Sequence, residues 1–123
     1  MKQANNILSI PRIIKAFYYA FSGLKTIFQT EVAFKQEILF TFLVIPLGLH
    51  FGATPVEKAI LISSWLLILL MEIINSAIEA VVDRISLERH PLSKKIKDIS
   101  AAAVLLSIIN ALIVWGIILT PSL

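Results

Sequence analysis

The 123-residue chain is strongly apolar, with 58% hydrophobic residues and a mean hydropathy of +0.88. Soluble domains are only about half apolar, so a water-soluble class is excluded and an all-α integral membrane protein is expected. The net charge of +3 does not call for a nucleic-acid partner, because lysines and arginines also serve as topology signals and contacts for anionic lipid. The absence of cysteine excludes disulfides and thiol chemistry.

The N-terminal segment, from about residue 7 to 29, has the pattern of an amphipathic helix lying on the membrane surface. Its apolar residues recur at spacings of three and four, and its basic and polar residues gather on the opposite side, as Arg12, Lys15, Tyr19, Ser22 and Lys25. Arg12 and Lys15 also interrupt the apolar run that a cleaved signal peptide requires. This helix is either an anchor alone or one wall of a site at the membrane surface.

Three longer apolar segments can cross a bilayer, at about residues 32–51, 56–83 and 97–119. A membrane-spanning helix needs about 20 apolar residues, and the stretch from Ile99 to Leu119 has no charge at all. Basic residues concentrate before the first span and between the second and third. The positive-inside rule therefore puts the N-terminus and the 84–98 loop in the cytoplasm, and the C-terminus on the periplasmic side. We expect residues 1–123 to form one multi-pass domain.

The second span ends in an acidic stripe, formed by Glu72, Asn75, Glu79 and Asp83. At about 100° per residue, these side chains fall within roughly 80° of one helix face. Charged side chains at the edge of a bilayer are costly, which makes them candidates for function. Two structural interpretations stay open: Asn75 can simply bond a neighbouring helix, and Glu79 and Asp83 can be solvated residues at a helix end.

The stripe covers two depths, because Glu72 and Glu79 differ by about 10 Å in height along a helix. Glu72, in partly desolvated surroundings, is the candidate proton acceptor for a lipid hydroxyl. Glu79, at the wetter end, is the first candidate ligand for Mg²⁺, with Glu31 or Glu37 as a further oxygen donor, and Lys97 is best placed to neutralise phosphate charge. This combination is typical of phosphoryl transfer. No GxxxxGK[ST] motif occurs, which excludes a P-loop nucleotide site.

The segment Glu72-Ile-Ile-Asn-Ser-Ala-Ile-Glu-Ala-Val-Val-Asp-Arg84 closely resembles the signature of the small prokaryotic integral-membrane diacylglycerol kinases. Three more segments fit that family in the same order: Arg12-Ile-Ile-Lys-Ala16, Glu31-Val-Ala-Phe-Lys-Gln-Glu37 and Lys97-Asp-Ile-Ser-Ala-Ala-Ala-Val104. The likeness extends from about Arg12 to Leu119. It implies a homotrimeric helical bundle in the bacterial inner membrane, with active sites shared between subunits. The implied reaction transfers the γ-phosphate of ATP, with Mg²⁺, to diacylglycerol and gives phosphatidic acid.

The resemblance also implies roles for individual residues. Glu72 matches the general base on the lipid hydroxyl, and Glu31 and Glu79 match the ligands of the nucleotide-associated metal. The positions that match ATP contacts are Arg12, Tyr19, Glu31, Glu79, Glu88, His90, Lys97 and Asp98, and those that match supporting residues are Glu37, Asn75 and Asp83. On this interpretation the surface helix belongs to the site, and His90 is a nucleotide contact instead of an exposed loop residue.

The chain departs from the family pattern near the start of the third span. Ala101 stands at a substrate-side position where a serine is expected, and Ser100 stands one position earlier in place of a glycine. A hydroxyl shifted by one residue points about 100° away, so we do not expect it to make the same lipid contact. The surface helix also differs at Phe17, Tyr18, Ala20, Phe21 and Ser22, which bears on acceptor preference.

Two other functions stay open from the sequence. A relative of the same fold phosphorylates undecaprenol, although Asn75-Ser-Ala-Ile-Glu79 followed by Ala-Val-Val-Asp-Arg84 favours the glycerolipid enzyme. A function of another class is that of a small oligomeric cation channel or transporter subunit, in which Glu72 and Asn75 line a pore.

Overall fold

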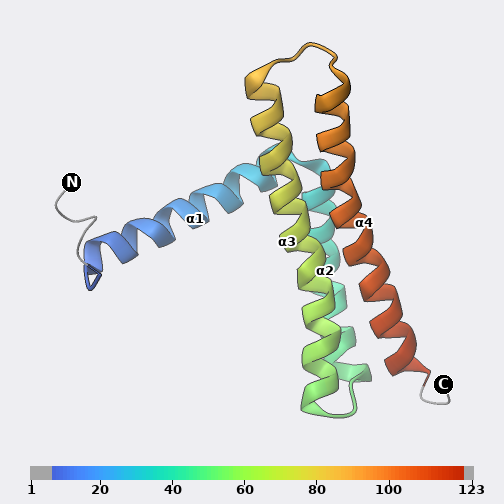
Figure 1. Ribbon diagram of the computed structural model, residues 1–123. Coiled ribbons are helices and arrows are strands. Elements are labelled where there is room, and N and C mark those ends of the chain that lie inside the picture. Colours follow the sequence, from blue (N-terminus) through green and yellow to red (C-terminus); the bar gives the residue numbers. More distant parts are fainter. Residues whose placement is uncertain (1–6, 121–123) are drawn as a thin grey trace.

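The computed structural model describes residues 7–120, which form four helices and no strand. The helices are α1 (Ile10–Thr30), α2 (Val32–Phe51), α3 (Pro55–Ile85) and α4 (Pro91–Leu119). Figure 1 shows α2, α3 and α4 running up and down as a bundle, with α1 projecting sideways from it. The predicted all-α architecture is confirmed. Residues 1–6 and 121–123, including the end that was expected in the periplasm, lie outside the described residues.

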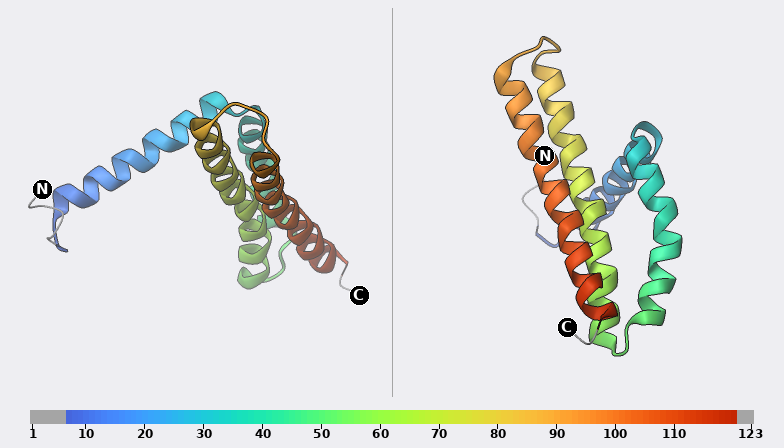
Figure 2. Two further views of the ribbon diagram at one scale, coloured as in Figure 1. Left: turned by 45° about the horizontal axis from the view of Figure 1, so that its top comes forward. Right: turned by 90° about the vertical axis from the view of Figure 1, so that its right-hand side faces the viewer.

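The surface helix α1 is attached to the bundle only near its C-terminal end. Ile27 is its one buried residue, and it packs against Phe34 of α2 and Leu69 of α3. The apolar residues earlier in α1 are exposed, and this part of the helix extends away from the bundle (Figures 1 and 2). An apolar face left uncovered along a projecting helix is typical of a helix that lies on a membrane.

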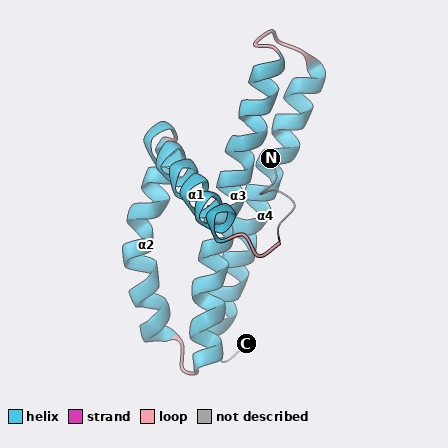
Figure 3. Ribbon diagram, turned by 90° about the vertical axis from the view of Figure 1, so that its left-hand side faces the viewer, coloured by secondary structure: helices cyan, strands magenta, loops and turns pink. Residues whose placement is uncertain are grey.

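The other three helices are long and apolar enough to cross a membrane, with 20 residues in α2, 31 in α3 and 29 in α4. At 1.5 Å per residue, α3 and α4 exceed the roughly 30 Å of hydrocarbon, so their ends reach the headgroup region. These two helices lie side by side along their length (Figures 2 and 3). Two residues of the acidic stripe on α3, Asn75 and Asp83, contact α4.

Local sequence explains where the helices start. Thr54 caps α3 in a capping box, accepting from Glu57 N at 3.1 Å while Glu57 Oε2 accepts from Thr54 N at 3.2 Å. In α4, His90 Nδ1 accepts from Leu92 N at 3.0 Å, and Pro91 occupies the first turn, where its missing N–H costs nothing. The helix thus begins at Pro91, ahead of the predicted span at 97.

Polar contacts tie the helices together in the half of the bundle away from the α3–α4 loop. Trp65 Nε1 of α3 donates to Thr41 Oγ1 of α2 at 2.8 Å. Trp115 Nε1 of α4 donates to Leu61 O and Ser64 Oγ of α3, both at 3.2 Å. Each such bond contributes roughly 0.6 kcal/mol on average in a membrane protein. Together they fix the register of the three spans, and with it the side chains that meet at the other end.

Candidate active site

Four carboxylates form an acidic cluster where α1, α2 and α3 meet, and all four are half-buried: Glu31, Glu37, Glu72 and Glu79. Glu37 of α2 and Glu72 of α3 lie within hydrogen-bonding reach of each other, and Glu31 and Glu79 act on Glu72 through their charge. Oε2 of Glu37 is buried and meets no hydrogen-bond donor within residues 7–120. Carboxylates that repel one another favour a proton or a cation beside them.

Asn75 links this cluster to α4. Its Nδ2 donates to Glu79 Oε1 at 3.1 Å, and its Oδ1 accepts from the Ser100 hydroxyl at 2.6 Å. Ser100 is only 6% exposed, whereas Ala101 is exposed. Because the serine stands at position 100 and not at position 101, its hydroxyl points toward α3 and away from the surface of α4 where Ala101 lies.

A cleft of about 680 Å³, the loop cleft, lies at the end of the bundle where α3 joins α4. Its volume is in the range of small-molecule sites. Half of the predicted nucleotide contacts line it, namely Glu88, His90, Lys97 and Asp98, together with Asp83 of the acidic stripe.

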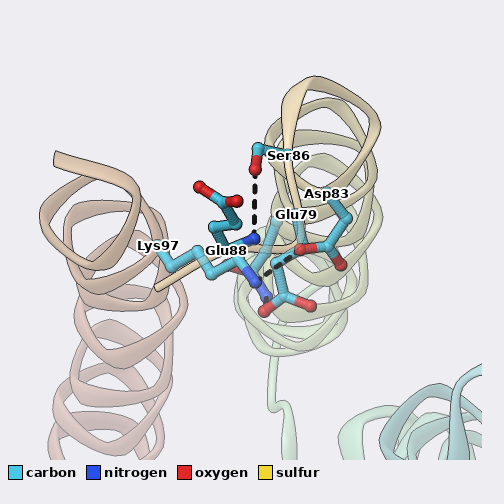
Figure 4. Close-up of polar contacts among 6 residues, drawn as sticks. Glu79, Asp83, Ser86, Glu88 and Lys97 are labelled. Carbon is cyan, nitrogen blue, oxygen red and sulfur yellow. Dashed lines mark hydrogen bonds and ion pairs between the residues drawn. The ribbon is translucent and has the colours of Figure 1, made fainter. Parts of the chain in front are cut away.

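Ion pairs between basic and acidic side chains organise the loop cleft. Lys97 Nζ lies 2.7 Å from Asp83 Oδ1 and also interacts with the charge of Glu79. Figure 4 shows Lys97 reaching from α4 toward Asp83 and Glu79 on α3. Both members of the Lys97 and Asp83 pair are partly exposed, and exposed pairs contribute little stability. Lys97 can therefore turn from Asp83 to a phosphate group at small cost.

Two polar contacts of the loop cleft involve residues that were not predicted from the sequence, Lys94 and Ser86. Lys94 Nζ lies 2.6 Å from Asp98 Oδ2, and Ser86 Oγ accepts from Glu88 N at 3.0 Å, which orders the turn (Figure 4). The spacing of four between Lys94 and Asp98 on one helix was the signal that could have identified the first. The Ser86 contact lies within an irregular turn, where helical periodicity predicts nothing.

A second cleft, the α1 cleft, has a volume of about 850 Å³ and lies between α1 and α3. Tyr19 and Ile27 of α1, Ile73 and Ser76 of α3, and Glu31 line it. Its lining combines apolar side chains, such as Leu24 and Ile27, with hydroxyl groups, such as those of Ser22 and Thr26. Glu31 belongs both to this cleft and to the acidic cluster.

A single chain does not bring every predicted residue together. Arg12 is exposed at the start of α1, on the part of the helix that extends away from the acidic cluster (Figure 1). Within the described residues, no three acidic or histidine side chains converge as a complete metal site. Mg²⁺ commonly takes only one or two carboxylates and completes its shell with water and substrate phosphates. The oxygen donors Glu31 and Glu79 fit that requirement.

Comparisons with known proteins show the family of the chain. Residues 18–119 match the family model described as prokaryotic diacylglycerol kinase. The chain is 45% identical to a diacylglycerol kinase of Escherichia coli K12 over 116 residues, which cover 94% of this chain and 95% of the relative. It is 42% identical to a diacylglycerol kinase of Haemophilus influenzae (89% and 93% covered) and 41% identical to one of Pseudomonas aeruginosa (89% of each). The chain belongs to the prokaryotic diacylglycerol kinase family.

Proposed function

We propose that this protein transfers the γ-phosphate of ATP to the hydroxyl of diacylglycerol, giving phosphatidic acid and ADP, at the cytoplasmic face of the bacterial inner membrane. The observation that carries the proposal is the position of the acidic cluster. It borders the α1 cleft through Glu31 and, through Asn75, Glu79 and Lys97, adjoins the loop cleft, which is lined by charged side chains. A lipid alcohol and a water-soluble phosphate donor can thus meet at carboxylates.

Glu72 is the group best suited to take the proton from the lipid hydroxyl. It is half-buried, lies one helical turn from Asn75 and stands at the deeper end of the acidic stripe. As the hydroxyl oxygen bonds to the γ-phosphorus, its proton passes to the Glu72 carboxylate and the bond between that phosphorus and the β–γ bridging oxygen breaks. Positioning and charge neutralisation supply most of the catalysis in such a transfer.

The proposed metal ligands are Glu31 and Glu79. When bound there, Mg²⁺ neutralises the charge of the nucleotide phosphates. Lys97 adds a positive charge from α4 next to Glu79, and Glu88, His90 and Asp98 line the cleft that would hold the rest of the nucleotide. Glu37 supports Glu72 from α2.

The active assembly is proposed to be a homotrimer with shared sites. One feature supports this: α1 extends away from its own bundle, and Arg12 belongs to the first turn of α1. A neighbouring subunit would receive Arg12 at its nucleotide site. The concentration of basic residues before α2 and in the α3–α4 loop supports a cytoplasmic N-terminus.

Phosphate transfer to defined acceptors tests the proposal. Purified protein in mixed micelles is given ATP labelled at the γ-phosphate, Mg²⁺ and either diacylglycerol or undecaprenol. We expect diacylglycerol to be phosphorylated, giving labelled phosphatidic acid, at a rate far above the rate of undecaprenol phosphorylation. Preferential labelling of undecaprenol would assign the other lipid kinase activity, and cation flux in liposomes without labelling of either lipid would favour a pore.

A further inference from the structure

Ser100 is a buried hydroxyl that the proposed reaction does not use. It lies on α4 at 6% exposure, and its hydroxyl donates to Asn75 Oδ1 on α3 at 2.6 Å. Asn75 is otherwise bonded to Glu79, at 3.1 Å. The three side chains thus form a chain of contacts from α4 to a proposed metal ligand.

The chemistry of the three groups fixes the direction of this chain. A carboxylate oxygen accepts hydrogen bonds only, so Glu79 requires the NH₂ end of the Asn75 carboxamide. The carbonyl end must then face α4, where it needs a donor. A hydroxyl can donate or accept, and in this setting Ser100 donates. Each donor in this chain faces an acceptor. If the Asn75 carboxamide or the Ser100 hydroxyl turned around, two acceptor oxygens would face each other.

We propose that Ser100 is a positioning residue that locks the carboxamide of Asn75 in the orientation that holds Glu79 Oε1, so that the carboxylate of Glu79 stays aimed for metal-bound nucleotide. The inference rests on the proposed function for its consequence in catalysis, but the lock itself is a property of the free protein. Without the Ser100 hydroxyl, Oδ1 of the half-buried Asn75 loses its donor. The Asn75 carboxamide can then rotate, which releases Glu79.

The test compares Ser100→Ala with Ser107→Ala. Ser107 is also buried on α4, at 3% exposure, but its hydroxyl donates within its own helix, to Val104 O at 2.6 Å. The first measurement uses ¹⁵N-labelled protein in micelles without substrate and follows the side-chain amide resonances of Asn75. We expect Ser100→Ala to shift or broaden them and Ser107→Ala to leave them in place. Unchanged resonances in Ser100→Ala would overturn the inference.

The second measurement separates KM from kcat. We expect Ser100→Ala to raise the KM for Mg²⁺-ATP about threefold to tenfold, the loss of one ordinary hydrogen bond, with kcat within twofold. Added to Asn75→Ala, it should produce no further change, because both act on Glu79 through one side chain. Additive effects, or an equal KM increase in Ser107→Ala, would contradict a positioning role.

A near-isosteric Ser100→Cys variant, which keeps only a weak donor, gives the same comparison if the alanine variant folds poorly. The two measurements also separate this inference from the proposed function. An Asn75 resonance that moves, in a protein that phosphorylates no lipid, would leave the lock standing and remove the kinase proposal.

Discussion

At the scale of single residues, Glu79 is the point where the contacts of the site converge. It accepts from Asn75, interacts through its charge with Lys97, and lies close enough to Glu72 to act on it in the same way. A carboxylate held by one donor at one oxygen keeps the other oxygen for a cation. This arrangement explains why the position is acidic and why its neighbours are amide and ammonium groups.

Glu79→Gln should weaken binding of Mg²⁺-nucleotide about tenfold or more, because a charged ligand of the cation is lost. Its oxygen can still accept from Asn75, so the helices should pack as before. Titration of the enzyme with Mg²⁺-ATP, checked against an unchanged unfolding temperature, measures this. Identical titrations of the variant and the wild type would remove Glu79 from the metal site.

Lys97→Met should raise the KM for Mg²⁺-ATP while leaving the unfolding temperature close to that of the wild type. The Asp83 pair is partly exposed and contributes little to folding, whereas a phosphate in the loop cleft would lose a neutralising charge. Kinetics and thermal unfolding of the same preparation decide the point. A large loss of stability with unchanged KM would show that Lys97 is structural.

At the scale of the helices, stability and chemistry lie at opposite ends of α3. The capping box of Thr54 and Glu57 and the tight turn at Gly52 close one end, where a Cβ on Gly52 would lie 2.7 Å from the backbone nitrogen of Lys58. The acidic stripe occupies the other end. Helix caps and catalytic residues can therefore be changed separately.

Thr54→Ala should destabilise the protein by about 1 kcal/mol, the usual cost of losing an N-cap side chain. Because the cap is at the far end of α3, kcat and KM should stay within twofold of the wild type. Equilibrium unfolding in detergent, together with the transfer assay, tests both expectations. A kinetic defect without loss of stability would contradict the separation of the two ends.

The sequence predicted the features that depend on one helix at a time. The acidic stripe follows from a step of about 100° per residue, and the spans follow from apolar length. The helix α4 begins at Pro91, before the predicted span, because a helix can include the charged residues that an apolar span excludes. The Ser100 bond to Asn75 could not be predicted, because it depends on the register of two helices, which one sequence does not specify.

At the scale of the whole molecule, the surface helix is the unusual element. It leaves the bundle with its apolar face uncovered and places Arg12 away from the acidic cluster of its own chain. If Arg12 binds the nucleotide at the site of a neighbouring subunit, α1 must extend away from its own bundle, as it does here. An anchor that served only its own chain would have no such requirement.

Mixed oligomers test the sharing of sites. Arg12→Ala and Glu72→Gln subunits, each inactive or nearly so alone, are dissociated, mixed and reassembled. We expect activity to return, because some sites then combine an intact Arg12 from one chain with an intact Glu72 from another. A control mixture of Glu72→Gln with Glu79→Gln should recover less, since both residues belong to α3. No recovery in the first mixture would favour sites built within one chain.

The central claim is that Glu72 takes the proton from the lipid hydroxyl, and Glu72→Gln tests it most directly. The substitution keeps the size of the side chain and removes the basic group. General base catalysis contributes roughly 10²- to 10⁴-fold, so kcat for diacylglycerol should fall by at least about a hundredfold while the affinity for Mg²⁺-ATP stays within a few fold. A variant that phosphorylates diacylglycerol at a rate near that of the wild type would contradict the account.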